Sequence, residues 1–142
     1  MHGQDSERYD MALIEGLAHP RPDIAEFCAW ILGERRVRAA VPALIAALER
    51  RTADIAVQAA IARALGRIGD PAAFPALLAA AERGAVTVRR AALEALDAID
   101  HARARPFLER ACLSDPSPSV RAGARWLLER EVPRDESAPS SS

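Results

Sequence analysis

The chain has 142 residues, with 19 basic against 20 acidic side chains and a formal net charge of −1. Because the charges are so evenly balanced, the chain has no overall electrostatic field that would attract nucleic acid or a membrane surface. We expect neither as a partner. Hydrophobic residues make up 50% of the chain, but aromatic residues make up only 4%. Many of the other hydrophobic residues are alanine, which is the strongest helix former. One domain of this length buries most of its apolar surface without metals or disulfides.

Residues 1–20 contain acids where a signal peptide is basic, and they hold no long apolar segment. No apolar run in the sequence reaches the length that spans a bilayer. The two cysteines, Cys28 and Cys112, form no C-x-x-C pair and are expected to be small buried hydrophobes. These features predict a cytoplasmic protein.

The first expected elements are a flexible N-terminus at residues 1–6 and a helix from about residue 7 to residue 18. Three similar units of two helices follow, with a spacing of about 32 residues. The first helix of each unit, the A helix, has apolar residues at positions 1, 4, 5, 8 and 9, which lie on one helical face. These apolar stripes, which we expect to be buried, are Ile24, Phe27, Cys28, Ile31 and Leu32; Val57, Ala60, Ile61, Ala64 and Leu65; and Val88, Ala91, Ala92, Ala95 and Leu96.

The second helix of each unit, the B helix, has a proline near its start, at Pro42, Pro75 and Pro106. Proline is tolerated in a first helical turn, because the N–H there has no acceptor within the helix. The expected buried residues are Val41, Leu44, Ile45 and Leu48 in the first unit, and Phe74, Leu77, Leu78 and Ala81 in the second. The segment 7–18 is a lone B helix by the same pattern, which it matches with Leu13, Ile14 and Leu17.

A last, lone A helix is expected to end near Glu131, and its apolar residues are Val120, Ala124, Leu127 and Leu128. Residues 132–142 are rich in serine and have the composition of a disordered tail. The sequence therefore predicts an all-α fold of about eight helices over residues 7–131.

Residues 57–81, VQAAIARALGRIGDPAAFPALLAAA, resemble the HEAT repeat in the short bacterial form first named for phycobilisome lyases. The resemblance implies a right-handed α-solenoid of helical hairpins, with A helices on the convex face and B helices on the concave face. Partners of HEAT proteins usually bind on the concave side. Because a repeat architecture serves many purposes, the resemblance predicts the fold and leaves the function open.

The Gly-x-x-Gly-Asp-Pro turn at residues 66–71 invites interpretation as a ligand loop, because a helix N-terminus follows it. It has no lysine and no Walker or Rossmann spacing, and the neighbouring units replace it with GERRVRAA and DAIDHARA. We interpret it as a bend in which Gly66 and Gly69 end an A helix, Asp70 caps the B helix and Pro71 lies in its first turn.

Catalytic and metal-binding patterns are weak in this sequence. The three histidines, His2, His19 and His101, have no metal-ligand spacing, and the chain lacks the His-Glu pairs that ligate iron in metal-dependent HEAT hydroxylases. Neither cysteine has a base near it in sequence. We predict no catalytic residue, no metal and no cofactor.

The outward side of the B helices is the candidate binding surface, because equivalent positions there form rows of small residues with an arginine edge. The rows are Ala12, Ala43, Ala76 and Phe107; Gly16, Ala47, Ala80 and Ala111; Glu15, Ala46, Ala79 and Arg110; and, at the edge, His19, Arg50, Arg83 and Ser114. An apolar floor with an arginine rim suits a helix or an acidic peptide of a partner protein. The candidate partner-binding residues are Glu15, His19, Arg50, Arg83, Phe107 and Arg110. The same pattern is also explained by alanine for close packing and arginine for solubility.

Trp30 and Trp126 share position 7 of the A helix, where Arg63 and Glu94 stand in the middle units. Either each tryptophan caps the apolar stripe near an end of the stack, or each is an exposed anchor.

The sequence as a whole predicts a noncatalytic protein-binding or scaffold module, with self-association through its open ends as a further expectation. The alternative is an enzyme-associated HEAT protein, either a bilin-lyase-like subunit or a relative of the metal-dependent hydroxylases that has lost its ligands.

Overall fold

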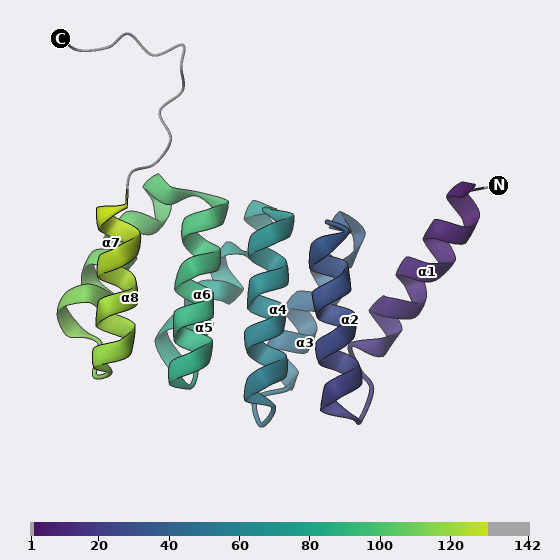
Figure 1. Ribbon diagram of the computed structural model, residues 1–142, viewed down its shortest axis with the longest axis horizontal. Helices are drawn as coiled ribbons and strands as arrows, with labels where there is room; N and C mark the ends of the chain where they lie inside the picture. The colour runs from purple at the N-terminus through teal and green to yellow at the C-terminus, as the bar shows by residue number, and fades with distance from the viewer. Residues whose placement is uncertain (1, 131–142) are drawn as a thin grey trace, which may run out of the picture.

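The computed structural model describes residues 2–130. This part of the chain forms eight α-helices and two short 3-10 helices, and it contains no strand. The elements are α1 (His2–Gly16), α2 (Pro22–Glu34), η1 (Arg38–Ala40), α3 (Val41–Arg50), α4 (Ile55–Ile68), η2 (Pro71–Ala73), α5 (Phe74–Arg83), α6 (Val86–Ile99), α7 (His101–Ser114) and α8 (Pro118–Glu129). In Figure 1 the A helices α2, α4, α6 and α8 stand side by side, with the B helices α3 and α5 behind them. The fold is an all-α solenoid, as the sequence predicts.

The register of the repeat is confirmed by the helix boundaries. Ile24, Val57, Val88 and Val120 are each the third residue of their A helix. The whole apolar stripe is buried in α4 and in α6, because each of these helices packs between two other A helices. One continuous core extends from Leu13 to Leu127.

The stripe of α2 is buried only in part. Cys28 and Leu32 are buried and Ile24 and Ile31 are half-buried, but Phe27 is 55% exposed, so the expectation that Phe27 lies in the core was wrong. Only one A helix, α4, packs on α2, since α1 lies on its other side. The outer edge of the stripe therefore has no second A helix to cover it.

Helix α1 begins at His2, earlier than the expected start near residue 7. In Figure 1 it leans away from the row of A helices. Leu13 and Leu17 are buried, so the apolar side predicted for this segment does join the core. A Cβ on Gly16 would come within 2.3 Å of the Sγ atom of Cys28, which shows how closely α1 approaches α2.

The turn after α4 is a helix-to-helix bend, as predicted. Gly69 adopts a left-handed conformation, with φ of 78°, and its N–H donates to the carbonyl of Leu65 at 3.0 Å. Asp70 then accepts a hydrogen bond from the Ala72 N–H at 3.0 Å and caps η2, which leads into α5.

Gly66 does not end a helix, and that expectation was wrong. It lies inside α4, where an added Cβ would be 2.9 Å from the Cα of Ala95 on α6. A glycine is required here because the backbones of two A helices nearly touch.

The prolines of the B helices occupy two different places. Pro42 and Pro75 are the second residues of α3 and α5, as expected, but Pro106 lies inside α7. In the third unit Asp100 accepts from the Arg103 N–H at 3.0 Å and starts the helix directly at His101. The segment that forms a separate 3-10 turn in the other units is therefore the first turn of α7.

The last A helix, α8, is capped by Ser117, whose hydroxyl accepts from the Val120 N–H, and it ends at Glu129. Glu131 and the tail expected at residues 132–142 lie outside the described residues. Within residues 2–130, no helix is both long and apolar enough to cross a membrane.

Candidate partner-binding surfaces

A hollow of about 200 Å³ opens between α5 and α7 on the B-helix side. Its lining residues are Leu78, Ala81, Glu82, Leu93, Phe107, Arg110, Ala111, Ser114, Asp115 and Pro116. The ring of Phe107 packs at 6.1 Å from the ring of Phe74, and the guanidinium of Arg110 lies 6.0 Å from the Phe107 ring. Two of the six candidate residues, Phe107 and Arg110, thus share one apolar hollow that reaches the buried Leu93.

A second hollow, of about 270 Å³, lies between α3 and α5 and is lined by Arg83 together with Ala76, Ala79 and Ala80. These alanines come from the rows of small residues that the sequence aligns. Gln58, at the base of this hollow, is buried and donates to the carbonyl of Leu48 at 2.9 Å. The hollow therefore has a small-residue floor and one exposed guanidinium beside it.

The other three candidates lie apart from both hollows. Arg50 is exposed, and its Nε donates to the carbonyl of Ala46 at 3.3 Å. The Nδ1 atom of His19 accepts from the Arg21 N–H at 3.0 Å, and Glu15 lines a separate depression on α1. The six residues are therefore spread over α1 and its following turn, α3, α5 and α7, and do not form one site.

Sequence reasoning missed several arginines that hold turns together. Arg51 donates from one nitrogen to the carbonyls of Leu17 and His19, which ties the end of α1 to the end of α3. Arg89 of α6 donates to both carboxylate oxygens of Asp115, at 3.0 and 2.9 Å. No sequence signal separates these arginines from their solvent-exposed neighbours, because their partners come from other repeats.

Asp115 titrates abnormally because of these contacts. Burial by itself would raise the pKa of its carboxyl, but the hydrogen bonds from Arg89 and from the Ser117 N–H, with the positive charges of Arg89 and Arg121, outweigh it and lower the pKa. The carboxylate is therefore ionised at neutral pH and supports the turn before α8.

A buried carboxylate also lies at the C-terminal end of α6. The side chain of Asp97 has no exposed surface, and it contacts Nδ1 of His101 on one side and the guanidinium of Arg130 on the other. His101 is the first residue of α7. The cluster joins the ends of α6, α7 and α8.

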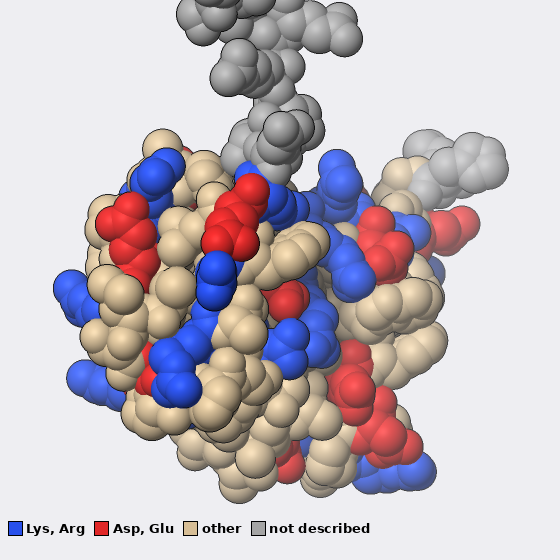
Figure 2. Space-filling view, turned by 60° about the vertical axis from the view of Figure 1, so that its left-hand side comes forward, with Lys and Arg blue, Asp and Glu red and all other residues tan. Residues whose placement is uncertain are grey.

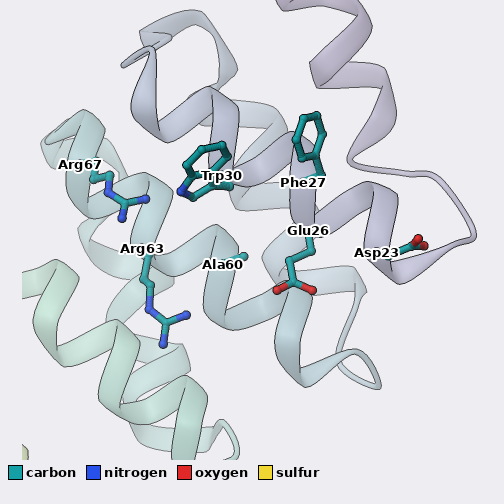
Figure 3. A pocket seen from close by; sticks show the side chains of 7 residues that line it. All are labelled: Asp23, Glu26, Phe27, Trp30, Ala60, Arg63 and Arg67. Atoms are coloured by element: carbon teal, nitrogen blue, oxygen red, sulfur yellow. The ribbon is translucent and has the colours of Figure 1, made fainter.

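The outward surface of the A helices, which we call the A ridge, has an aromatic groove between α2 and α4. The groove has a volume of about 350 Å³ and is lined by Asp23, Glu26, Phe27, Trp30, Ala60, Arg63 and Arg67. Figure 3 shows the two aromatic rings on α2 and the two guanidinium groups on α4. The rings of Phe27 and Trp30 are tilted against each other with 6.4 Å between their centres.

Both tryptophans are exposed, Trp30 by 48% and Trp126 by 62% of their surface. A tryptophan that capped the apolar stripe would be largely buried, and neither of these is. In Figure 2, which brings the α7–α8 end forward, basic side chains gather across the middle of the view beside uncharged residues, with acidic side chains interspersed. The mixture of signs agrees with the even charge balance of the chain.

The described residues include no group of three or more His, Cys, Asp or Glu side chains that could hold a metal ion. Cys28 is buried, and its burial raises the pKa of the thiol, so the reactive thiolate is disfavoured at neutral pH. Cys112 is half-buried on α7. The B-helix hollows and the groove on the A ridge are open, largely apolar features of the described surface.

Comparison with known proteins identifies the family. A model of HEAT repeats matches twice, at residues 11–86 and 50–129. The chain belongs to the HEAT repeat family. The two matches overlap and together cover the solenoid from α1 to α8.

Two known proteins are similar to this chain. Deoxyhypusine hydroxylase of Homo sapiens is 38% identical over 101 residues, which are 71% of this chain and 33% of that protein. The chain thus spans about a third of the length of that relative. Among solved structures, the complex of CpcE and CpcF of phycocyanin lyase from Nostoc sp. PCC7120 is similar with a TM-score of 0.57 and 27% identity, over 86% of this chain and 65% of that chain.

Proposed function

We propose that this chain is a noncatalytic module that binds a protein partner on its B-helix face. The observation that carries the proposal is the hollow between α5 and α7, where Phe107 and Arg110 line an apolar opening of about 200 Å³. A hollow of this size accepts one apolar side chain, which is how anchor residues engage at protein interfaces. Arg110 at its edge favours a carboxylate next to that anchor.

The second hollow extends the same surface. Arg83 borders it, and its alanine floor allows the backbone of a bound helix or extended peptide to come close. Arg50 and Arg83, at the ends of α3 and α5, add positive charge along one edge. Together these features fit an acidic peptide or helix of a partner protein, and the solved relative, itself a complex of two proteins, supports the use of such repeats in assembly.

The test is affinity capture with the wild-type chain and with an Arg50→Glu, Arg83→Glu variant, followed by calorimetry with each captured protein. We expect the variant to lose binding while its far-UV circular dichroism stays unchanged, because both arginines are exposed. A matched variant, Arg38→Glu with Arg125→Glu, reverses two exposed arginines outside both hollows and should bind normally. Equal binding by the two double variants would contradict the proposal.

A hollow variant tests the anchor directly. Phe107→Ala removes the aromatic wall, and Arg110→Glu reverses the charge at its edge. We expect both to weaken the same captured partner, whereas Ala56→Ser, an exposed change on α4 outside both hollows, should have little effect.

The second candidate is a subunit associated with an enzyme, either of bilin-lyase type or derived from a metal-dependent hydroxylase. The similarities to deoxyhypusine hydroxylase and to the phycocyanin lyase complex favour it. Purified protein that carries pigment or stoichiometric iron would support this candidate. Colourless, iron-free protein that binds a protein partner would support the first.

A further inference from the structure

Each A helix has one stripe on the side of the A ridge, made of four residues with the spacing i, i+4, i+7 and i+11, of which Ala60 on α4 and Ala91 on α6 are buried and the others are exposed or half-buried. The stripes are Asp23, Phe27, Trp30 and Glu34 on α2; Ala56, Ala60, Arg63 and Arg67 on α4; Thr87, Ala91, Glu94 and Ala98 on α6; and Ser119, Gly123, Trp126 and Arg130 on α8 and just after it. Because the helices stand side by side in Figure 1, residues of equal position form rows across the ridge.

The row at the third place of the stripe has an unusual symmetry. It reads Trp30, Arg63, Glu94 and Trp126 from α2 to α8, and all four side chains are exposed. When the row is laid against its own reverse, tryptophan meets tryptophan and arginine meets glutamate at both inner places. Opposite charges at matching places are the pattern that steers two surfaces together.

The row at the second place leaves one large side chain exposed. It reads Phe27, Ala60, Ala91 and Gly123, and the same reversal brings Phe27 opposite Gly123, whereas Ala60 and Ala91 are buried between the helices. Phe27 is 55% exposed, so much of its ring is available for contact with another surface. Large against small residues is how two helical surfaces interdigitate.

We propose that a second copy of this chain binds on the A ridge through a two-fold axis that runs parallel to the A helices and passes between α4 and α6. A half-turn about this axis keeps the direction of the helices and reverses their order, so α2 faces α8 of the second copy and α4 faces α6. Trp126 of each copy then enters the groove beside Phe27 and Trp30 of the other, and Arg63 meets Glu94 twice.

The charges select this arrangement over the alternative two-fold pairing. An axis along the row of helices would place each helix against its own copy, with Arg63 facing Arg63 and Glu94 facing Glu94. Like charges in contact oppose association. Within residues 2–130, Arg63 and Glu94 have no ion-pair partner, whereas Asp23 pairs with Arg21 at 2.8 Å and Arg67 with Glu34 at 3.3 Å.

The proposed contact joins two features of each copy, the groove between α2 and α4 and the exposed Trp126 on α8. The groove of about 350 Å³ is bordered by Phe27, Trp30 and Ala60. Trp126 is 62% exposed, and the guanidinium of Arg130 lies 5.5 Å from its ring centre. Since Arg130 is in turn held by the buried Asp97, the indole has a neighbour that limits its movement. A partly ordered anchor loses less conformational entropy on binding.

Sedimentation velocity and light scattering of the full chain test the proposal. We expect a dimer whose dissociation constant rises at least about tenfold in Arg63→Glu and in Glu94→Arg, because each change places like charges together twice. The double variant Arg63→Glu, Glu94→Arg exchanges the two charges and should restore association to near the wild-type value. A chain that stays monomeric at about 1 mM, or a double variant as weak as the single ones, would overturn the proposal.

Cross-linking tests the direction of the axis. In a Cys112→Ser background, Arg63→Cys protein mixed with Glu94→Cys protein should form a disulfide-linked pair, and neither protein alone should do so. Linkage of Arg63→Cys protein to itself would contradict the proposed axis. The Arg50→Glu, Arg83→Glu variant serves as the control and should dimerise normally, because those residues lie on the B helices.

Discussion

The junctions between successive A helices are built in two ways. At α2–α4 and α4–α6 a glycine occupies position 10 of the repeat, and a Cβ on Gly33 or Gly66 would lie 2.8 or 2.9 Å from the Cα of the facing alanine, Ala64 or Ala95. At α6–α8 the same position holds Asp97, whose buried carboxylate contacts His101 and Arg130. The inner junctions are closed by backbone contact and the last one by charge.

The difference shows how one repeat pattern adapts to its place in the stack. An inner A helix has neighbours on both sides, so close backbone packing buries its surface without any polar group. At the last junction the ends of three helices meet, and a carboxylate there can join α7 and α8 to α6. Polar partners that remain partly exposed, as His101 and Arg130 do, reduce the cost of burying that carboxylate.

The largest effect is expected from filling an inner junction. Gly33→Leu places a side chain against the backbone of α4, which cannot move without disturbing α6, so we expect the free energy of unfolding to fall by about 3 kcal/mol. Urea denaturation followed by circular dichroism measures it. Gly3→Leu is the matched control, because nothing lies within 4 Å of a Cβ there, and it should not be destabilised. Equal losses in the two variants would show that the junction is not closely packed.

Removal of the charge at the last junction should cost less. Asp97→Ala deletes contacts to two charged or polar partners, but both partners can be hydrated again, so we expect a loss of about 2 kcal/mol in the free energy of unfolding. Asp97→Gly places the glycine of the inner junctions at this position and should be no more stable than Asp97→Ala. If Asp97→Gly matched the wild type in urea denaturation, the two kinds of junction would be interchangeable and the comparison would fail.

The other end of α6 provides a pH-dependent version of the same test. The pKa of Asp115 is lowered below its ordinary value near 3.8, so its stabilisation is present above that value and is lost as the pH falls through the lower folded pKa. We expect Asp115→Asn to cost about 1 kcal/mol at neutral pH and nothing in strong acid. Denaturation curves over a pH series measure the difference. A difference that stays the same as the pH falls through the acid range of the series would exclude the ion pair with Arg89 as its source.

The smallest effect is expected where a glycine faces a side chain. A Cβ on Gly16 would meet the Sγ atom of Cys28, which can rotate, whereas a Cβ on Gly33 would meet backbone. Gly16→Ala should therefore change the free energy of unfolding by less than about 1 kcal/mol, and Gly33→Ala should cost more. The two variants, measured side by side in urea, rank the junctions, and a reversed order would refute this interpretation.

Much of the fold was predictable because its signals are local. The apolar stripe repeats with the helical period, the Gly69–Asp70 bend follows the rules of helix ends, and the shared position of Ile24, Val57 and Val88 sets the register. The errors arose at positions where packing against a neighbouring helix decides whether a residue is exposed or why it is there. Phe27 is exposed because no second A helix covers it, and Gly66 is needed for the approach of α6 and not for a turn.

The candidate surfaces were predictable only as rows of residues. Phe107 and Arg110 were named as candidates, but the hollow that they share depends on the separation of α5 from α7. Asp97 was not predicted as a contact residue, because a single acidic residue in a helix forms no recognisable sequence pattern. Its partner Arg130 belongs to another repeat and lies beside it only in the folded chain. Trp30 and Trp126 were aligned correctly, while their exposure could be learned only from the packed structure.

The sequence by itself determined the helices, their order and their register, because hydrophobic periodicity and helix-end residues act over a few positions of the chain. The tertiary structure decided which equal positions are buried, which glycines hold two backbones together and where hollows open. These properties depend on the distance between helices that are a repeat apart, and that distance results from the packing of all their side chains at once.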